Sequence, residues 1–150
     1  MNDKEIMSVA FDEARAAHNR GECPVGAAIV RNGDILARAG NRAIELNDPT
    51  AHAEILVLRE AGQLLKKPIF SDCTVYTTLW PCPMCTNALL QAKISKVVCG
   101  AKSFKYVYEE TFNPSRIIIE GPIMSEECRG IFIKWVRETG REFILDGEDI

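Results

Sequence analysis

The 150-residue sequence predicts an α/β fold in which helices cover both faces of a five-stranded mixed sheet. Three observations lead to this prediction. Segments with helical periodicity alternate along the chain with short apolar segments that have the length and composition of strands. A hairpin signal near the N-terminus implies an antiparallel pair, whereas later strands follow helices and are expected to run parallel. No repeat, low-complexity tract or linker divides the chain, so residues 1–150 are expected to form a single domain.

The N-terminal third is expected to form a helix followed by a β-hairpin. Apolar residues recur at three- and four-residue steps between Ile6 and Ala17, which predicts an amphipathic helix capped near Asn2 or Asp3. The segments PVGAAIV and ILARAG then flank RNGD, and Asn-Gly between two apolar runs is a strong hairpin signal.

The central part of the chain is expected to place two helices around a strand. A turn and a cap at Thr50 precede helical periodicity in the segment AHAEILVLREAGQLL. CTVYTTL is rich in β-branched and aromatic residues, which favours a strand. A further helix is expected to have Cys82 as its N-cap and Pro83 in its first turn. The helices that begin near His52 and Cys82 each adjoin a strand, so their N-termini can meet at one edge of the sheet.

The C-terminal third completes the order α-β-β-α-β-α-β-β-α. KVVCGA and RIIIEG are short and continuously apolar, which is typical of strands in a sheet covered on both faces. SEECRGIFIKWVRET has the periodicity of a final helix, and GREFILDGEDI follows it.

Composition and charge exclude several classes of protein. Hydrophobic residues make up 47% and charged residues 26% of the chain, as in ordinary globular proteins. The net charge of −3 provides no overall basic field, so nucleic acid is not the expected partner. The N-terminus lacks the apolar region of a signal peptide, and no apolar run approaches the roughly 18 residues of a membrane span. We therefore expect a cytoplasmic protein without a membrane partner, in which the cysteines stay reduced.

The segment PCPMC, which contains Cys82 and Cys85, requires a chemical explanation. A redox dithiol is one interpretation, and a structural zinc site is another. A structural site needs four protein ligands, but the chain has neither a second CxxC nor an HxxxH. A redox pair is disfavoured by the proline before the first cysteine and by another plausible ligand set upstream, in TAHAE.

A catalytic zinc site is the favoured interpretation. Cys82 and Cys85 share one face of a helix, whose positive N-terminal end stabilises thiolates. His52 adds a third ligand and leaves the fourth tetrahedral position to water, as catalytic zinc requires. Glu54 diverges from His52 on its helix, so it is expected to carry protons instead of binding the metal.

HAE and PCPMC match the H-x-E…P-C-x-x-C signature of zinc deaminases, and the chain resembles the cytidine deaminase-like superfamily along nearly its whole length. The order of the elements also agrees. This resemblance implies a hydrolytic deaminase, commonly a homodimer, in which zinc is bound by His52, Cys82 and Cys85. It also implies that Glu54 protonates the ring nitrogen and later the leaving amine.

Two branches of this superfamily are most similar and imply different substrates. ECPVGAAIV, GNR and NDPTAHAEI resemble the bacterial tRNA adenosine deaminases, which convert adenosine to inosine. That branch has a glycine-rich stretch where this chain reads GAKSFKYVYEETFNPS, and a C-terminal helix rich in lysine and arginine that this sequence does not obviously contain. DCTVYTTLWPCPMCTNALL and the ending from EECRG onward instead resemble fungal-type cytosine deaminase and related free-base deaminases, although TAHAE is closer to the RNA and guanine deaminases.

We therefore expect the substrate to be a small free base, namely cytosine or a related amino-oxo base such as isocytosine or guanine. The second branch implies that Phe143 stacks on this base and that Asp146 binds its exocyclic amine. Asn41 matches the asparagine that both branches use to hold the base, and Ala53 and Phe104 are further candidate substrate contacts. Asn41 could instead cap a strand, Phe143 pack in the core and Asp146 belong to a solvated tail. Deamination of adenosine in tRNA is the alternative function.

Overall fold

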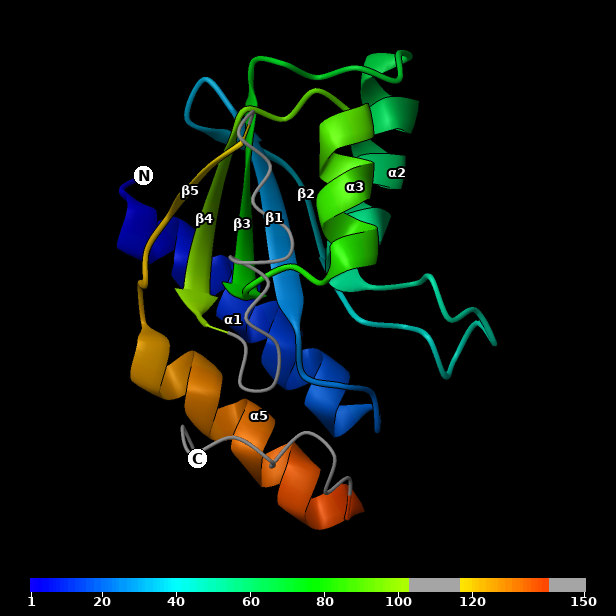
Figure 1. Ribbon diagram of the computed structural model, residues 1–150, viewed down its shortest axis with the longest axis vertical. Coiled ribbons are helices and arrows are strands. Elements are labelled where there is room, and N and C mark those ends of the chain that lie inside the picture. The colour runs from blue at the N-terminus through cyan, green and yellow to red at the C-terminus, as the bar shows by residue number, and fades with distance from the viewer. Residues whose placement is uncertain (103–116, 141–150) are drawn as a thin grey trace.

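In the computed structural model of this chain, which describes residues 1–102 and 117–140, the helices and strands follow the predicted order (Figure 1). They are α1 (Asp3–Asn19), β1 (Gly26–Arg31), β2 (Asp34–Gly40), α2 (Ala53–Leu65), β3 (Cys73–Leu79), α3 (Pro83–Gln91), β4 (Lys96–Ala101), β5 (Ile118–Glu120) and α5 (Ser125–Thr139).

The strands of the described residues form one mixed sheet with the order β2-β1-β3-β4-β5. β1 pairs antiparallel with β2 and with β3, whereas β3, β4 and β5 run parallel. The chain passes from β3 to β4 through α3, which is the kind of crossover that parallel neighbours require. The carboxyl ends of β3 and β4 therefore lie at the same end of the sheet, and the predicted five-stranded mixed sheet is confirmed.

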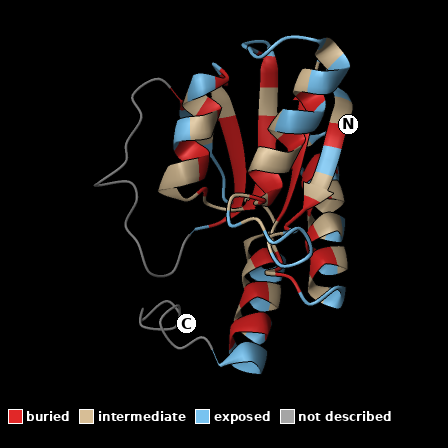
Figure 2. Ribbon diagram, turned by 90° about the vertical axis from the view of Figure 1, so that its right-hand side faces the viewer, coloured by how far each residue is buried: buried red, intermediate tan, exposed pale blue. Residues whose placement is uncertain are grey.

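Helices cover both faces of the sheet, which confirms the predicted three-layer architecture (Figures 1 and 2). On one face, Val57 of α2 and Leu89 of α3 pack with Val75 of β3 in a buried cluster. On the other face, Met7 of α1 and Cys128 of α5 belong to a second buried cluster. Full burial of one apolar side chain of this size contributes roughly 1.5–3 kcal/mol. The first cluster holds α2 and α3 against one face of the sheet, and the second holds α1 and α5 against the other.

Local signals in the N-terminal third act as expected. Asn2 is the N-cap of α1, and its side-chain oxygen accepts a hydrogen bond from the Glu5 N–H at 2.8 Å. Asn32 and Gly33 connect β1 to β2 with positive φ angles of 51° and 81°. Both values belong to the left-handed region that a two-residue hairpin turn requires, so the predicted hairpin is confirmed.

The cap predicted for the second helix at Thr50 is wrong. The helix α2 begins at Ala53, and its N-cap is His52. Thr50 instead donates hydrogen bonds from its N–H and Oγ1 to Asp48 Oδ1, at 2.9 and 2.7 Å. The side chain of an aspartate can close a turn by accepting a hydrogen bond from the N–H two residues later. Because Thr50 belongs to such a turn with Asp48, it does not cap the helix, which begins three residues later at Ala53.

The strand β5 also departs from expectation. RIIIEG was expected to be buried on both faces, but Ile118 is 62% exposed. β5 is a three-residue strand at the edge of the sheet, in which Ile118 and Glu120 are exposed and Ile119 is half-buried against the core. The continuous apolar pattern therefore overestimates its burial.

Membrane insertion was not expected, and none of the helices in residues 1–102 and 117–140 has the length and hydrophobicity needed to cross a bilayer. The cytoplasmic location and the organisation of residues 1–150 as one domain stay predictions.

Candidate metal centre and active site

The N-termini of α2 and α3 lie at the same end of the molecule, as the sequence predicts (Figure 1). His52 is the N-cap of α2, with φ −75° and ψ 155°, and Cys82 is the N-cap of α3, with φ −68° and ψ 169°. Neither residue makes the side-chain N-cap hydrogen bond that is usual at this position. Pro83 occupies the first turn of α3, where its lack of an N–H costs nothing. The two cap side chains approach each other between the helix ends.

Three potential metal ligands converge between these helix ends. Nδ1 of His52 lies 3.7 Å from Sγ of Cys82 and 3.5 Å from Sγ of Cys85. All three donor atoms lie within 4.8 Å of one another. Cys85 is fully buried, whereas His52 and Cys82 are half-buried. Such a cluster has one side fixed in the core and another that solvent can reach.

The spacing of these atoms fits zinc. Zn–S bonds of roughly 2.3 Å and Zn–N bonds of roughly 2.0 Å in tetrahedral geometry place nitrogen and sulfur ligands roughly 3.5 Å apart. The observed separations of 3.5 and 3.7 Å agree with this value. Among the described residues the cluster has three potential ligands and not four, which is the arrangement of a catalytic site with one coordination position open.

The two thiols differ in acidity before any metal binds. The pKa of Cys82 is lowered because the Cys85 thiol and His52 form hydrogen bonds with its sulfur. The pKa of Cys85 is raised, since it donates to Cys82 and is buried. One negative charge therefore resides on Cys82, and its hydrogen bond also raises the pKa of His52. Zinc binds deprotonated ligands, so metal binding must displace protons from this cluster.

Glu54 lies in the first turn of α2 and is the least satisfied polar group near the site. Its side chain is 3% exposed, and Oε1 is a buried atom without a hydrogen-bond partner among the described residues. Burial raises the pKa of Glu54 to about 7, against the opposing effect of His52. A buried polar atom without a partner costs roughly 1–3 kcal/mol, and such atoms need a functional explanation. A carboxyl in this state can exchange protons near neutral pH.

Asn41 follows β2 and lies beside the residues that lead into α2. It is 6% exposed, and its N–H donates to the Val25 carbonyl at 3.0 Å. The next residue, Arg42, donates its N–H to the Ala51 carbonyl at 3.0 Å, immediately before His52. The segment that carries Asn41 is thus attached to the segment that carries His52.

The structure says less about the other predicted substrate contacts, Ala53, Phe104, Phe143 and Asp146. Ala53 is fully buried and belongs to the core cluster on the α2 and α3 side of the sheet, so only its main chain remains for a substrate. Phe104, Phe143 and Asp146 lie outside the described residues.

The sequence analysis did not identify Glu22, which contacts Asn41. The Glu22 side chain is 1% exposed, and Oε1 accepts a hydrogen bond from Asn41 Nδ2 at 3.2 Å. No local pattern marks this residue, because its partners lie 19 or more positions further along the chain. A glutamate beside the apolar run PVGAAIV is the one indirect signal.

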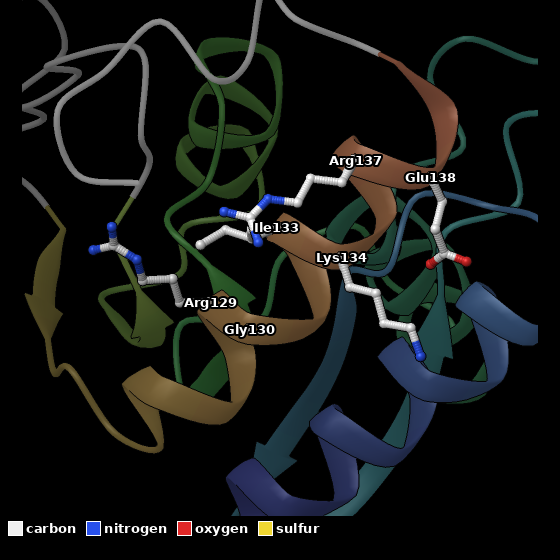
Figure 3. Close-up of a pocket in the computed structure, with 6 residues that line it drawn as sticks. All are labelled: Arg129, Gly130, Ile133, Lys134, Arg137 and Glu138. Carbon is white, nitrogen blue, oxygen red and sulfur yellow. The ribbon is translucent and has the colours of Figure 1, made fainter.

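A basic hollow along α5 was also missed. It has a volume of about 460 Å³, and Figure 3 shows the side chains that project around it from this helix. The hollow is lined by Arg129, Gly130, Ile133, Lys134, Arg137 and Glu138. Three cations and one carboxylate give it a local positive charge, although the chain as a whole carries −3. Figures 1 and 2 show α5 at the end of the molecule toward which the N-termini of α2 and α3 point.

A His-Cys-Cys cluster that could hold zinc, beside a buried carboxyl at the helix ends of this α/β/α sheet, matches the arrangement of a zinc-dependent deaminase. The enzyme class and the zinc cofactor predicted from the sequence are confirmed. The chain belongs to the cytidine and deoxycytidylate deaminase family, whose zinc-binding region matches residues 1–101.

Comparison with similar proteins indicates which deaminases this chain resembles most. The tRNA-specific adenosine deaminase of Bacillus subtilis is 38% identical over 149 residues, which cover 93% of this chain and 92% of that protein. A solved structure from "Biochemical and Structural Studies of A-to-I Editing by tRNA:A34 Deaminases at the Wobble Position of Transfer RNA" superimposes with a TM-score of 0.80 and 37% identity, over 85% of this chain and 98% of the other. The guanine deaminase of Bacillus subtilis has a TM-score of 0.68 and 31% identity, over 91% of this chain and 95% of the other.

The expectation of a free-base substrate is wrong. Further tRNA-specific adenosine deaminases match at 36% to 46% identity, so these relatives favour the alternative function. The expectation that nucleic acid is not a partner is wrong for the same reason. Net charge averages over the whole surface, whereas a phosphate backbone responds to local charge such as that along α5. The predicted homodimer stays a prediction.

Proposed function

We propose that this protein deaminates adenosine to inosine in tRNA. The observation that carries the proposal is the match of 93% of the chain to a tRNA-specific adenosine deaminase. The His52, Cys82 and Cys85 cluster supports the same reaction, because hydrolytic deamination of cytosine and of adenine uses the same zinc and glutamate chemistry. The structural similarity to a tRNA deaminase that acts at the wobble position favours that adenosine as the target.

In the proposed reaction, His52, Cys82 and Cys85 would hold the zinc. When bound, zinc supplies a Lewis acid that lowers the pKa of a water molecule to roughly 7. Glu54 would accept a proton from this water and deliver it to N1 of the adenine ring. It would then transfer the other proton of the same water molecule to the amine that leaves C6. Water and adenosine thereby give inosine and ammonia.

The environment of Glu54 supports this role. A carboxyl whose pKa is about 7 holds and releases protons with comparable ease at neutral pH, which is the condition for efficient acid–base catalysis. Its position in the first turn of a helix whose N-cap is the metal ligand keeps it near the reacting atoms without making it a ligand.

Two features support a polynucleotide substrate. The hollow on α5 provides Arg129, Lys134 and Arg137, and phosphate contacts by such side chains supply much of the affinity for RNA. Asn41 is the proposed contact to the target nucleotide, since it lies beside the residues that lead into α2.

The proposal is tested with the zinc-loaded full chain and a panel of substrates. Ammonia release is measured for cytosine, guanine, adenosine and a tRNA with adenosine at the wobble position, and inosine is mapped in the RNA by sequencing. The same tRNA with guanosine at that position is the matched control. We expect ammonia and inosine from the adenosine-containing tRNA only. Release from free guanine or cytosine, with none from either tRNA, would overturn the proposal.

A further inference from the structure

Glu22 is a fully buried carboxylate between α1 and β1 that binds three donors. Its Oε1 accepts from Asn41 Nδ2 at 3.2 Å and from the Ile44 N–H at 2.9 Å. Its Oε2 accepts from the Glu45 N–H at 2.8 Å. All three donors are neutral and lie in the loop between β2 and α2, so one carboxylate organises the start of this loop.

The position of Glu22 is itself rigid. Its N–H donates to the Ala17 carbonyl at 2.9 Å, which attaches it to the last turn of α1. Arg20 Nη2, from the same loop, donates to the Asn41 carbonyl oxygen at 3.1 Å. Asn41 is thereby held through its side chain by Glu22 and through its main chain by Arg20 and Val25.

Burial of the Glu22 carboxylate has a desolvation cost that its three neutral donors offset only in part. Removing a carboxylate from water costs several kcal/mol, and neutral donors compensate for it less well than a cation would. An apolar residue or a glutamine could fill the same space with less desolvation. A carboxylate at this position is therefore consistent with a role in orienting its partners.

The contact selects one of the two orientations of the Asn41 amide. An ionised carboxylate only accepts hydrogen bonds, so the amide nitrogen and not Oδ1 must face Glu22. A flipped amide would place two acceptor oxygens about 3 Å apart and lose the hydrogen bond. In the part of the chain that the structure describes, Oδ1 and the second N–H of Asn41 therefore remain, in a fixed direction, for another group.

We propose that Glu22 is a positioning residue for substrate binding: it orients the Asn41 amide and the adjoining loop before the substrate arrives. This inference rests on the proposed substrate contact of Asn41. Preorganisation of this kind lowers the cost of binding, because the asparagine does not have to be ordered or turned when the nucleotide enters. Loss of this positioning should therefore weaken substrate binding and leave the zinc content unchanged.

A double-mutant cycle tests the inference with the zinc-loaded full chain. The variants are Glu22→Gln, Asn41→Ala and the double variant, and kcat and KM are measured with the best substrate from the ammonia panel. Loss of one hydrogen bond to substrate should raise KM roughly tenfold in Asn41→Ala, and Glu22→Gln should raise it by a comparable factor. In the Asn41→Ala background, Glu22→Gln should change KM by less than about twofold, because the residue it positions is gone.

The matched control is Glu13→Gln, which makes the same chemical change at a carboxylate on α1 that bonds Arg38 Nε at 2.7 Å. It should leave KM, kcat and zinc content at wild-type values. Glu22→Asp is a second variant in case Glu22→Gln folds poorly. Because its side chain is one methylene shorter, it keeps the charge but withdraws it from Asn41, and KM should again rise.

A readout independent of activity is the NMR signal of the Asn41 side-chain NH₂. In the wild type its protons should exchange slowly, and Glu22→Gln should accelerate the exchange. Multiplicative effects on KM in the cycle, or an unchanged Asn41 signal in Glu22→Gln, would overturn the inference. Because the cycle uses whichever substrate the panel identifies, a wild type that fails on tRNA refutes the proposed function and leaves the test of Glu22 intact.

Discussion

Removing two positive charges from α5 should weaken the binding of RNA by an amount that the structure allows us to estimate. Lys134 and Arg137 both line the basic hollow, and each is expected to neutralise one phosphate. Each such contact contributes roughly 0.7–0.9 to the slope of log Kd against log salt concentration. The double variant Lys134→Ala/Arg137→Ala should therefore reduce this slope by about 1.5. At 0.1 M salt, this change corresponds to a loss of affinity of about 30-fold.

The assay is fluorescence anisotropy with a labelled anticodon stem-loop, titrated at several salt concentrations between about 50 and 200 mM. Over this range the wild type should lose about eightfold more affinity than the variant. The matched control is Lys4→Ala/Lys67→Ala, which removes two exposed charges near the start of α1 and after the end of α2. Figure 1 shows the end of α2 at the opposite end of the molecule from α5, and the start of α1 far from the C-terminal half of α5, which carries Lys134 and Arg137.

A salt slope that is the same in the wild type and the α5 variant would refute this reasoning. An equal decrease in the slope of log Kd against log salt concentration in the control variant would also refute it, because the net charge and not the hollow would then determine affinity.

Three further predictions concern the catalytic centre and the fold. Glu54→Gln should keep its zinc but lose turnover by roughly 10²–10⁴-fold, since the amide cannot carry protons; metal analysis and inosine formation measure both, and a near-normal rate would place the proton carrier elsewhere. Cys85→Ala should lose zinc and activity together, and full metal content would contradict the ligand assignment. Gly26→Ala should lower the free energy of unfolding by roughly 1–3 kcal/mol, because its Cβ would lie 1.9 Å from the Ala10 carbonyl oxygen of α1. Thermal unfolding tests this last prediction, and an unchanged melting temperature would contradict it.

The sequence by itself determined the order of the elements and the composition of the metal cluster. Asn2, Asn32 and Gly33 act through bonds and dihedral angles within a few residues, so their effects can be read locally. His52 and Cys82 are 30 positions apart, but their side-chain chemistry and the motifs HAE and PCPMC mark them as candidate ligands before any geometry is known. Local propensity did not predict the start of α2, because the Thr50 hydroxyl donates a hydrogen bond to Asp48 and does not cap the helix.

Only the tertiary structure decided how the site is supported and what approaches it. Glu22 and Asn41 come from different loops, and neither residue type predicts that one will orient the amide of the other. The charge of α5 is positive where Arg129, Lys134 and Arg137 gather around one hollow, although the sum over the sequence is negative. Burial of Ile118 could not be read from its apolar neighbours, because exposure depends on the place of β5 at the edge of the sheet. Each of these properties depends on distances between residues that are remote in the chain, and those distances exist only after folding.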